Sequence, residues 1–405
     1  MKILLLSEAP MCVDAGGISQ TLYNILSFCK QDELLCIAPE KEFERYPPSQ
    51  PFVDRYITYK FEILKTPQNR IGRFLQSFIS NINYGYNYFR RFAELKKSIK
   101  SFAPDIIISC PNGITGVFMH HKLLKNYRGT IIPYFMDDWM YKITVNVWLG
   151  NVQDLVRNIL KENDAWMMIG NELAELLQER YRLKPKNILA IRNPVNVNDA
   201  PIPRRLTKKN QHTLAYAGAL WGMHIDAFKI IAEAVKILSN EIKFSLIVYT
   251  SSSNWEWRKA ELENLNVTYG GSIPYNQIHQ KLSEVDGLIV VSSFSEEYYT
   301  HTKGSIQTKI TDYLKSQRLI ISCGPDYSAN HNFLKKYDCG LCIETKNVNE
   351  VAGYLKRIFN NIEEYQPLID KGFNVLQSEF SFETVQTKLK NFLKENQSRI
   401  SNSQL

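Results

Sequence analysis

Residues 288–325 constrain the fold most, because they contain two short strand patterns with a helical pattern between them. Leu288–Val291 and Leu319–Ser322 are aliphatic, largely β-branched runs that fit buried strands. After a polar loop, apolar residues recur three and four positions apart from about Ile306, the spacing of a helix with one buried face. A strand–helix–strand unit of this kind predicts an α/β domain.

The same alternation of strand and helix runs along the whole chain in two sets of similar size. A chain of 405 residues is long enough for two domains of about 200 residues each. Strands are expected at 2–6, 34–38, 104–109, 130–135, 165–170 and 187–192, and then at 213–217, 244–249, 267–270, 288–291, 319–322 and 340–344. Residues 197–211 are polar and contain prolines, which is typical of an interdomain linker.

Composition places the chain among reduced globular proteins. The seven cysteines are scattered and mostly lie in apolar runs, so they are expected to be free and buried. Cys339 and Cys342 have metal-site spacing, but no second such pair accompanies them and the segment fits a strand. Lys2–Leu6 fits a strand rather than a signal peptide, and no run is long enough to span a membrane. We expect a cytoplasmic protein, with peripheral attachment to the inner membrane face as an alternative.

The loop and helix after the strand at 288–291 carry residues suited to a diphosphate. Lys303, Gly304 and Ser305 precede the predicted helix, whose first backbone N–H groups would face outward at its positive end. Lys309 and Asp312 follow three residues apart, on one face of that helix. The cation suits phosphate, and the carboxylate suits the hydroxyl groups of a ribose.

At these residues the chain resembles a known family. The segment KGSIQTKITDYLKSQRLIISCGP (303–325) is similar to the donor-binding segment of GT-B glycosyltransferases, especially retaining family 4. Residues 165–196, which end in the run NPVN, resemble the end of the first GT-B domain. The resemblance implies two Rossmann-like, doubly wound domains that face a cleft, with a last helix that crosses back to the first domain. The first domain would comprise 1–196 with 380–396, and the second 212–379.

The resemblance also implies an activity. A hexosyltransferase-like enzyme of this kind moves a sugar from a nucleoside-diphosphate donor to a polysaccharide or lipid-linked acceptor, with retention of configuration. No cofactor and no metal are expected.

Carried over position by position, the family's site includes Asp137 and Asp138 as candidate catalytic carboxylates at the end of the strand 130–135. An N-cap role for these aspartates is the alternative. The candidate donor-binding residues come from both domains; they are Gly16, Gly17, Gly218, Trp221, Arg258, Ile273, Lys303, Gly304, Ser305, Lys309 and Asp312.

The chain departs from the family pattern at three places. The family usually has an Arg and a Lys for the donor phosphates in the first loop of the second domain, whereas Ala219–His224 contains neither. Of the family's two glutamates eight positions apart, Asp312 matches the second, and Gly304 stands at the first. Asp137–Asp138 replaces a His–Asp pair. Two alternative functions therefore stay open, an inactive GT-B partner or binding subunit and a GT-B sugar-nucleotide epimerase.

Residues 60–100 concentrate positive charge. They contain nine Lys or Arg against two Glu, with aromatic residues interleaved, in a chain of net charge +8. Basic and aromatic residues on helices suit an anionic membrane surface, where a lipid-linked acceptor would be met. A solvated basic face above a core of aromatic residues is the alternative. No recognisable nucleic-acid module is present, so nucleic acid is not an expected partner.

Overall fold

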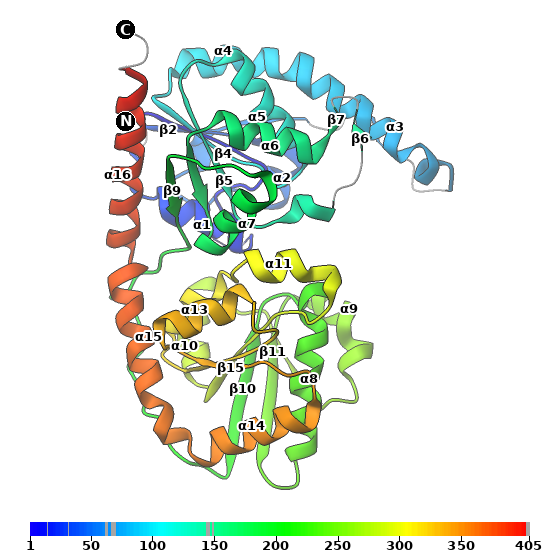
Figure 1. Ribbon diagram of the computed structural model, residues 1–405, viewed down its shortest axis with the longest axis vertical. Helices are drawn as coiled ribbons and strands as arrows, with labels where there is room; N and C mark the ends of the chain where they lie inside the picture. The colour runs from blue at the N-terminus through cyan, green and yellow to red at the C-terminus, as the bar shows by residue number, and fades with distance from the viewer. Residues whose placement is uncertain are drawn as a thin grey trace. The chain divides into compact units, whose positions relative to one another are not determined.

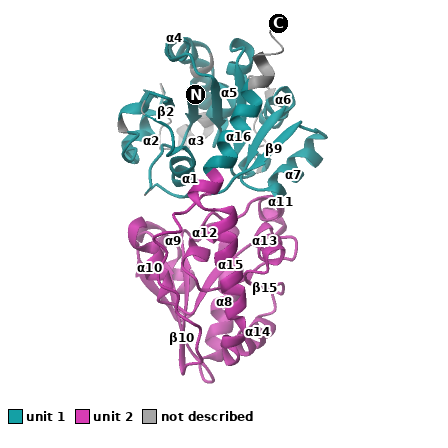
Figure 2. Ribbon diagram, turned by 90° about the vertical axis from the view of Figure 1, so that its left-hand side faces the viewer, with its two compact units in different colours: residues 1–192, 386–405 teal, residues 193–385 magenta. Residues whose placement is uncertain are grey.

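The computed structural model divides the chain into two compact units. It describes residues 1–13, 15–30, 32–60, 64–65, 70–142, 146–147 and 150–401, with the backbone alone for 53, 70–77, 87–88, 142, 146–147, 150 and 398–401. Unit 1 comprises Met1–Arg192 with Gln386–Leu405, and unit 2 comprises Asn193–Val385 (Figure 2).

Unit 1 is built on a seven-stranded sheet of order β3-β2-β1-β4-β5-β8-β9, with parallel neighbours throughout. Its strands are β1 (Ile3–Ser7), β2 (Leu34–Pro39), β3 (Tyr56–Tyr59), β4 (Ile106–Cys110), β5 (Thr130–Phe135), β8 (Ala165–Met168) and β9 (Asn187–Ala190). Its longer helices are α1 (Gly17–Leu26), α2 (Glu40–Arg45), α3 (Arg70–Tyr86), α4 (Phe92–Phe102), α5 (Ile114–Asn126), α6 (Val152–Glu162) and α7 (Asn171–Tyr181). A short antiparallel pair, β6 (Asn146–Val147) and β7 (Gly150–Asn151), precedes α6.

Unit 2 repeats this plan with a six-stranded parallel sheet of order β12-β11-β10-β13-β14-β15. Figure 1 shows strands β10, β11 and β15 with helices of the unit around them. Its strands are β10 (Gln211–Ala217), β11 (Lys243–Tyr249), β12 (Val267–Gly271), β13 (Gly287–Val291), β14 (Leu319–Cys323) and β15 (Leu341–Ile343). Its helices are α8 (Gly222–Leu238), α9 (Ser252–Leu262), α10 (Tyr275–Ser283), α11 (Tyr299–Gly304), α12 (Lys309–Lys315), α13 (Ala329–Tyr337), α14 (Val348–Asn360) and α15 (Gln366–Glu379).

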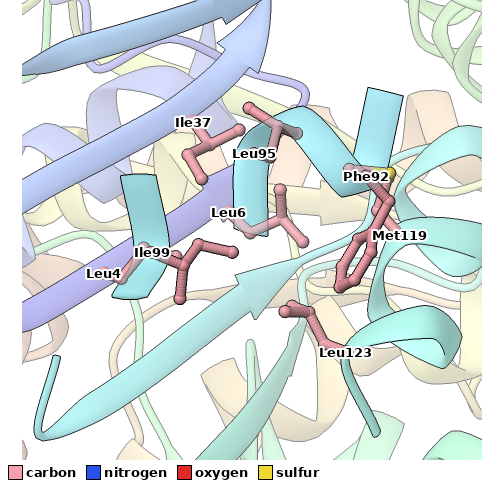
Figure 3. Close-up of a pocket in the computed structure, with 8 residues that line it drawn as sticks. All are labelled: Leu4, Leu6, Ile37, Phe92, Leu95, Ile99, Met119 and Leu123. Carbon is pink, nitrogen blue, oxygen red and sulfur yellow. The ribbon is translucent and has the colours of Figure 1, made fainter. Parts of the chain in front are cut away.

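Apolar side chains from both faces of each sheet form the cores. In unit 2, Leu214, Ile289 and Ile321 from three adjacent strands are fully buried beside Phe228 of α8 and Phe359 of α14. In unit 1, α4 and α5 pack over β1 and β2. The small pocket there is lined only by apolar side chains and is too narrow for a water molecule (Figure 3). That pocket is a packing gap within the core.

The last helix, α16 (Phe382–Ser401), begins in unit 2 and continues into unit 1 from Gln386 onward. In unit 1, the Gln386 side-chain amide donates to the Asn24 carbonyl at 3.0 Å and to the Ser27 hydroxyl at 2.7 Å. The Asn187 amide donates to Asn396 at 3.2 Å. These polar contacts hold the end of the chain against the first unit.

The expectation of two doubly wound α/β domains is confirmed. Every strand expected from the apolar runs is present, with ends shifted by one or a few residues. Five α-helices were not anticipated, α2, α6, α11, α13 and α15, and the helix expected from about Ile306 begins instead at Lys309. All seven cysteines are free. No helix in the part of the chain that the structure describes is long and apolar enough to cross a membrane.

Residues 197–211, expected to be an interdomain linker, pack on unit 2 and belong to it. The Gln317 amide donates to the Pro201 carbonyl at 2.7 Å, and the Leu206 N–H donates to Gln366 at 3.0 Å. The Leu206 side chain is 5% exposed and belongs to the core of the unit. The polar composition of the segment reflects its remaining exposed side chains.

This packing predicts unequal effects for two substitutions in the same segment. Leu206→Ala should lower the free energy of unfolding of unit 2 by about 2–4 kcal/mol, because it opens a cavity in the core. Ile202→Ala is the matched control, since Ile202 is 89% exposed and should change that free energy by less than about 0.5 kcal/mol. Hydrogen exchange of the unit 2 strands measures both values, and equal effects would contradict the place of Leu206 in the core of unit 2.

Candidate functional site

The candidate site of unit 2 lies where its strand order reverses. β10 is flanked by β11 on one side and by β13 on the other. The chain therefore passes from β10 to β11 in one direction across the sheet, and from β13 to β14 in the opposite direction. In open parallel sheets, ligands bind outside the carboxyl ends of the strands at such a point. The segments that meet there are Gly218–Trp221 after β10 and Ser292–Phe294 after β13, where the Ser293 N–H donates to the Met223 carbonyl at 3.1 Å.

The loop after β10 is shaped by one glycine and one buried tyrosine. Gly218 has φ +122°, a conformation that favours glycine, and its N–H donates to the Tyr249 carbonyl at 2.8 Å. The Tyr216 hydroxyl donates to the Ala219 carbonyl at 2.9 Å. Trp221 then precedes α8 and supplies no side-chain hydrogen bond to the first N–H groups of the helix. Those N–H groups carry the positive end of the helix dipole.

Lys309 projects its amine into this loop. Its Nζ lies 3.6 Å from the centroid of the Tyr216 ring. A Cβ atom on Gly218 would lie only 3.2 Å from that Nζ, so any other residue there would crowd the amine. The Nζ atom is buried and has no hydrogen-bond partner among the residues that the structure describes.

The surroundings of Lys309 oppose its positive charge. Burial holds the pKa of its amine well below the usual value. His224 nearby is kept neutral, since burial, and then the charge of Lys309, lower its pKa to about 3. A buried amine without a partner is costly. An anion that reaches this loop would supply the missing partner and favour the charged form.

Asp312 lies one turn further along the same helix and has a partner of its own. Its carboxylate is 2.9 Å from His279 Nε2, and both residues are buried. His279 comes from α10, so this pair ties α10 to α12. A ribose hydroxyl could reach Asp312 only by sharing the carboxylate with His279.

Trp221 and Arg258 lie together at the edge of the same loop. The indole rings of Trp221 and Trp257 are 6.0 Å apart, and the Arg258 guanidinium lies 3.8 Å from the centroid of the Trp257 ring. The Arg258 Nε donates to the Leu220 carbonyl at 2.8 Å, and its NH1 donates to Glu261 at 2.6 Å. Arg258 thus holds the loop in shape instead of presenting a free cation, which differs from its expected role.

Residues 303–305 also differ from the expectation. Gly304 is the last residue of α11, and residues 305–308 separate it from the start of α12. The Ser305 N–H donates to the His301 carbonyl at 2.8 Å, so it does not face outward. Lys303 lies on α11, 5.8 Å from the centroid of the Tyr299 ring, and Ile273 is half-buried in the turn before α10. The structure therefore brings Gly218, Trp221, Arg258 and Lys309 to one loop.

In unit 1, the two candidate catalytic aspartates have different surroundings. Asp138 is fully buried and forms a two-pronged ion pair with Arg180 of α7, with one of the two contacts at 2.8 Å. Its role is structural, because both oxygens are occupied. Asp137 is partly exposed and accepts the Trp139 N–H at 2.9 Å, the local bond of a capped turn. Burial, and the charge of Asp138, raise the pKa of Asp137 to about 6.

The glycine pair of unit 1 begins α1. Gly16 has φ +104° and is exposed, and no atom of the described residues lies within 4 Å of where its Cβ would be. Gly17 is the first helical residue. The open space at Gly16 fits close approach of another molecule to the backbone.

The basic segment 60–100 is only partly described, and the side chains of Arg70 and Arg73 lie outside the described residues. Phe78 and Phe89 are 66% and 59% exposed, whereas Phe92 is buried in the core. The aromatic residues thus divide between surface and core. Among the described residues, no cluster of His, Cys, Asp or Glu suits a metal ion.

Two contributors to the unit 2 site were not anticipated. Tyr216 lies within an ordinary strand pattern, and nothing in the spacing distinguishes its ring, which lies against Lys309. His279 is 33 residues from Asp312, and only the folded sheet brings α10 beside α12.

Comparison with known proteins supports the fold. No protein-family model matches the chain, and no curated protein sequence matches it. Among solved structures, Anabaena HepE in complex with UDP and glucose is similar at 11% identity with a TM-score of 0.67, covering 98% of this chain and 100% of that one. Sucrose-phosphate synthase from Thermosynechococcus elongatus matches at 13% identity with a TM-score of 0.70, covering 98% of each chain. The lipopolysaccharide outer core galactosyltransferase WaaB matches at 14% identity with a TM-score of 0.64, covering 98% of this chain and 99% of that one.

The fold is GT-B. Both parallel-sheet units are covered by these matches, which confirms the fold expected from the sequence. At these identities the likeness concerns the fold alone.

The Asp138–Arg180 pair predicts a loss of stability when it is broken. Asp138→Asn should destabilise unit 1 by roughly 2–4 kcal/mol, because it leaves Arg180 without its counter-charge in a mostly buried site. Asp164→Asn is the matched control in the same unit, since the Lys186–Asp164 pair is exposed and should contribute less than about 1 kcal/mol. Hydrogen exchange of β5 and β8 measures both effects. If the two variants proved equally stable, Asp138 would not have the structural role given to it.

Proposed function

We propose that the protein is a glycosyltransferase that binds a nucleoside-diphosphate sugar at the loop formed by Gly218, Trp221 and Lys309. The observation that carries the proposal is the unpartnered, buried Lys309 amine beside the amino end of α8. A diphosphate would pair with that amine and with N–H groups at the amino end of α8, which no side chain caps. Asp312 would accept from the ribose, in competition with His279.

The solved structures with this fold support a nucleotide sugar as the donor. HepE is described in complex with UDP and with UDP-glucose, and WaaB is a galactosyltransferase. Because the overall identities are low, the support lies in the shared fold together with the amine found in this chain. The departing diphosphate would be stabilised by Lys309 and by the dipole of α8.

The acceptor and the stereochemistry follow from the sequence resemblance. We propose a polysaccharide or lipid-linked acceptor, and transfer with retention of configuration. The exposed Phe78 and Phe89, within a segment rich in Lys and Arg, support contact with an anionic membrane surface. We propose a cytoplasmic protein peripheral to the inner face of the membrane, in which the reaction uses no cofactor.

A GT-B binding subunit without activity is the second candidate. Ala219–His224 contains no Lys or Arg, and the Arg258 guanidinium is held by Leu220 and Glu261. Among the described residues that contact the loop after β10, Lys309 is the one basic side chain without a hydrogen-bond partner. Turnover of a nucleotide sugar in a screen with several donors separates the two functions. Binding of UDP without hydrolysis or transfer for any donor and acceptor favours the subunit.

Substituting Lys309 should change nucleotide affinity and stability in opposite directions. Lys309→Met should weaken UDP binding by roughly 1.5–3 kcal/mol, the range for a hydrogen bond to a charged group. The same substitution should stabilise unit 2 by about 1–3 kcal/mol, because it removes an unsatisfied buried polar group. Calorimetric titration with UDP and hydrogen exchange measure the two effects.

Lys356→Met is the matched control for this prediction, since Lys356 is an exposed lysine of the same unit, paired with Glu241. It should leave UDP affinity unchanged. UDP affinity that is equal in the wild type and in Lys309→Met contradicts the assignment of the site. A wild-type protein that binds no nucleoside diphosphate contradicts the proposed function itself.

Nucleotide binding should also take up a proton. Burial depresses the pKa of Lys309 in the unliganded protein, and a bound diphosphate should raise it again. At a pH between the pKa of Lys309 in the free protein and its pKa in the complex, the amine is neutral in the free protein and charged in the complex. UDP affinity therefore falls as pH rises toward the pKa of the complex. Titrating UDP at several pH values between about 7 and about 10, each in two buffers of different ionisation enthalpy, should show uptake that depends on pH in the wild type and none from this group in Lys309→Met. Uptake that persists in the variant points to another group.

A further inference from the structure

The function proposed above needs a diphosphate to reach an amine that is closed off from solvent. The Lys309 Nζ atom is buried and lacks a hydrogen-bond partner among the residues that the structure describes. On one side it lies against the ring of Tyr216, a fully buried residue of the unit 2 core. The loop on that side is held in place as well, since the Gly218 N–H donates to the Tyr249 carbonyl. Access to Lys309 therefore calls for movement elsewhere in the site.

The segment between β13 and α12 lies over the amino end of α8. Residues 295–306, which we call the cover, contain the short 3-10 helix η4 (Glu296–Tyr298) and α11. Gly222 is the first residue of α8, and a Cβ atom added to it would collide with the Tyr298 hydroxyl. Because the Cα–Cβ bonds of a helix tilt toward its amino end, this hydroxyl lies at the amino end of α8.

The cover also adjoins the residues around Lys309. His224 of α8 is one of them, since its Nδ1 lies 3.2 Å from the Tyr216 hydroxyl. Burial, and then the charge of Lys309, lower the pKa of His224, and the charge of His301 on α11 adds to this effect. Lys309 and the cover are therefore both close to the same buried histidine.

Hydrogen bonds fix the chain at both ends of the cover. Before it, the Asp226 carboxylate of α8 accepts the Ser293 hydroxyl at 2.8 Å and the Phe294 N–H at 2.9 Å. After it, the Gln307 N–H donates to the Asn330 side chain at 3.0 Å. A movement of η4 and α11 would therefore leave the two flanking strands in place.

The closed cover leaves several buried polar atoms without partners. Among the described residues, Thr300 Oγ1, Ser305 Oγ and Gln307 Oε1 are buried and form no hydrogen bond, and Lys309 Nζ follows a few positions later. Buried polar groups in folded proteins nearly always have a partner. The closed position is thus unfavourable for four groups that water or a ligand would satisfy after opening.

We propose that the cover opens to admit the diphosphate of a nucleotide to Lys309, and that the contact between Tyr298 and Gly222 keeps the cover closed in the unliganded protein. This inference rests on the proposed function and adds an opening step to it. The structural alternative is a rigid cover, with entry through a movement of the Lys309 side chain alone. The two differ in whether a change at Gly222 alters access to Lys309.

Gly222→Ala tests the proposal on the full chain, because the added methyl group meets only the Tyr298 side chain and alanine favours the helix. The probe is acetic anhydride, which acetylates an amine that it can reach and releases acetate. Mass spectrometry then measures the rate at each lysine. Without UDP, the variant should raise the rate at Lys309 roughly tenfold, because one contact of the closed state is lost. The rate at the exposed Lys356 should not change.

Stopped-flow measurement of UDP association gives a second readout. Association should become faster in Gly222→Ala by a similar factor, since the open fraction of the protein limits it. Tyr298→Ala removes the same contact from the other side and should act in the same direction. Gly353→Ala is the matched control, because Gly353 lies on α14 of the same unit and nothing is within 4 Å of an added Cβ. It should behave as wild type.

Equal acetylation rates at Lys309 in the wild type, Gly222→Ala and Tyr298→Ala overturn the proposal. A wild type in which Lys309 reacts as fast as the exposed Lys356 overturns it as well. If Gly222→Ala does not fold, Tyr298→Ala decides the question. A wild type that binds no UDP contradicts the proposed function instead, and the acetylation rates then still show whether the cover opens.

Discussion

The unsatisfied amine of Lys309 is the feature on which the account of unit 2 depends. A folded protein rarely keeps a buried donor without a partner, because removing such a group from water costs several kcal/mol. Here the amine lies against the face of the Tyr216 ring and beside a glycine that leaves room for it. A bound anion would give the Lys309 amine the partner that it lacks. The uncapped amino end of α8 favours the same anion.

The parallel sheet explains why the candidate site of unit 2 lies where it does. The strand order reverses beside β10, so the segments after β10 and after its later neighbour β13 meet at one edge. This edge carries the Lys309 amine and the amino end of α8, and both favour an anion.

The fold could be predicted from the sequence because buried parallel strands are continuous apolar runs that need no knowledge of their partners. The site could be predicted only in part. Lys309 was identified from its place on a helix, but the partners of Asp138 and Asp312 lie 42 and 33 residues away and no local spacing indicates them. Tyr299–Gly304 has no apolar periodicity, so its helix was not predicted. The hydrogen bond from the Ser305 N–H to the His301 carbonyl was therefore not predicted either.

A crystal structure of the protein grown with UDP tests the central claim most directly. The account predicts that oxygens of the diphosphate lie about 2.7–2.9 Å from the Lys309 Nζ, beside Gly218 and the first turn of α8. Density for UDP at another place in unit 2, with the Lys309 amine still buried against Tyr216 and without a partner, would contradict it.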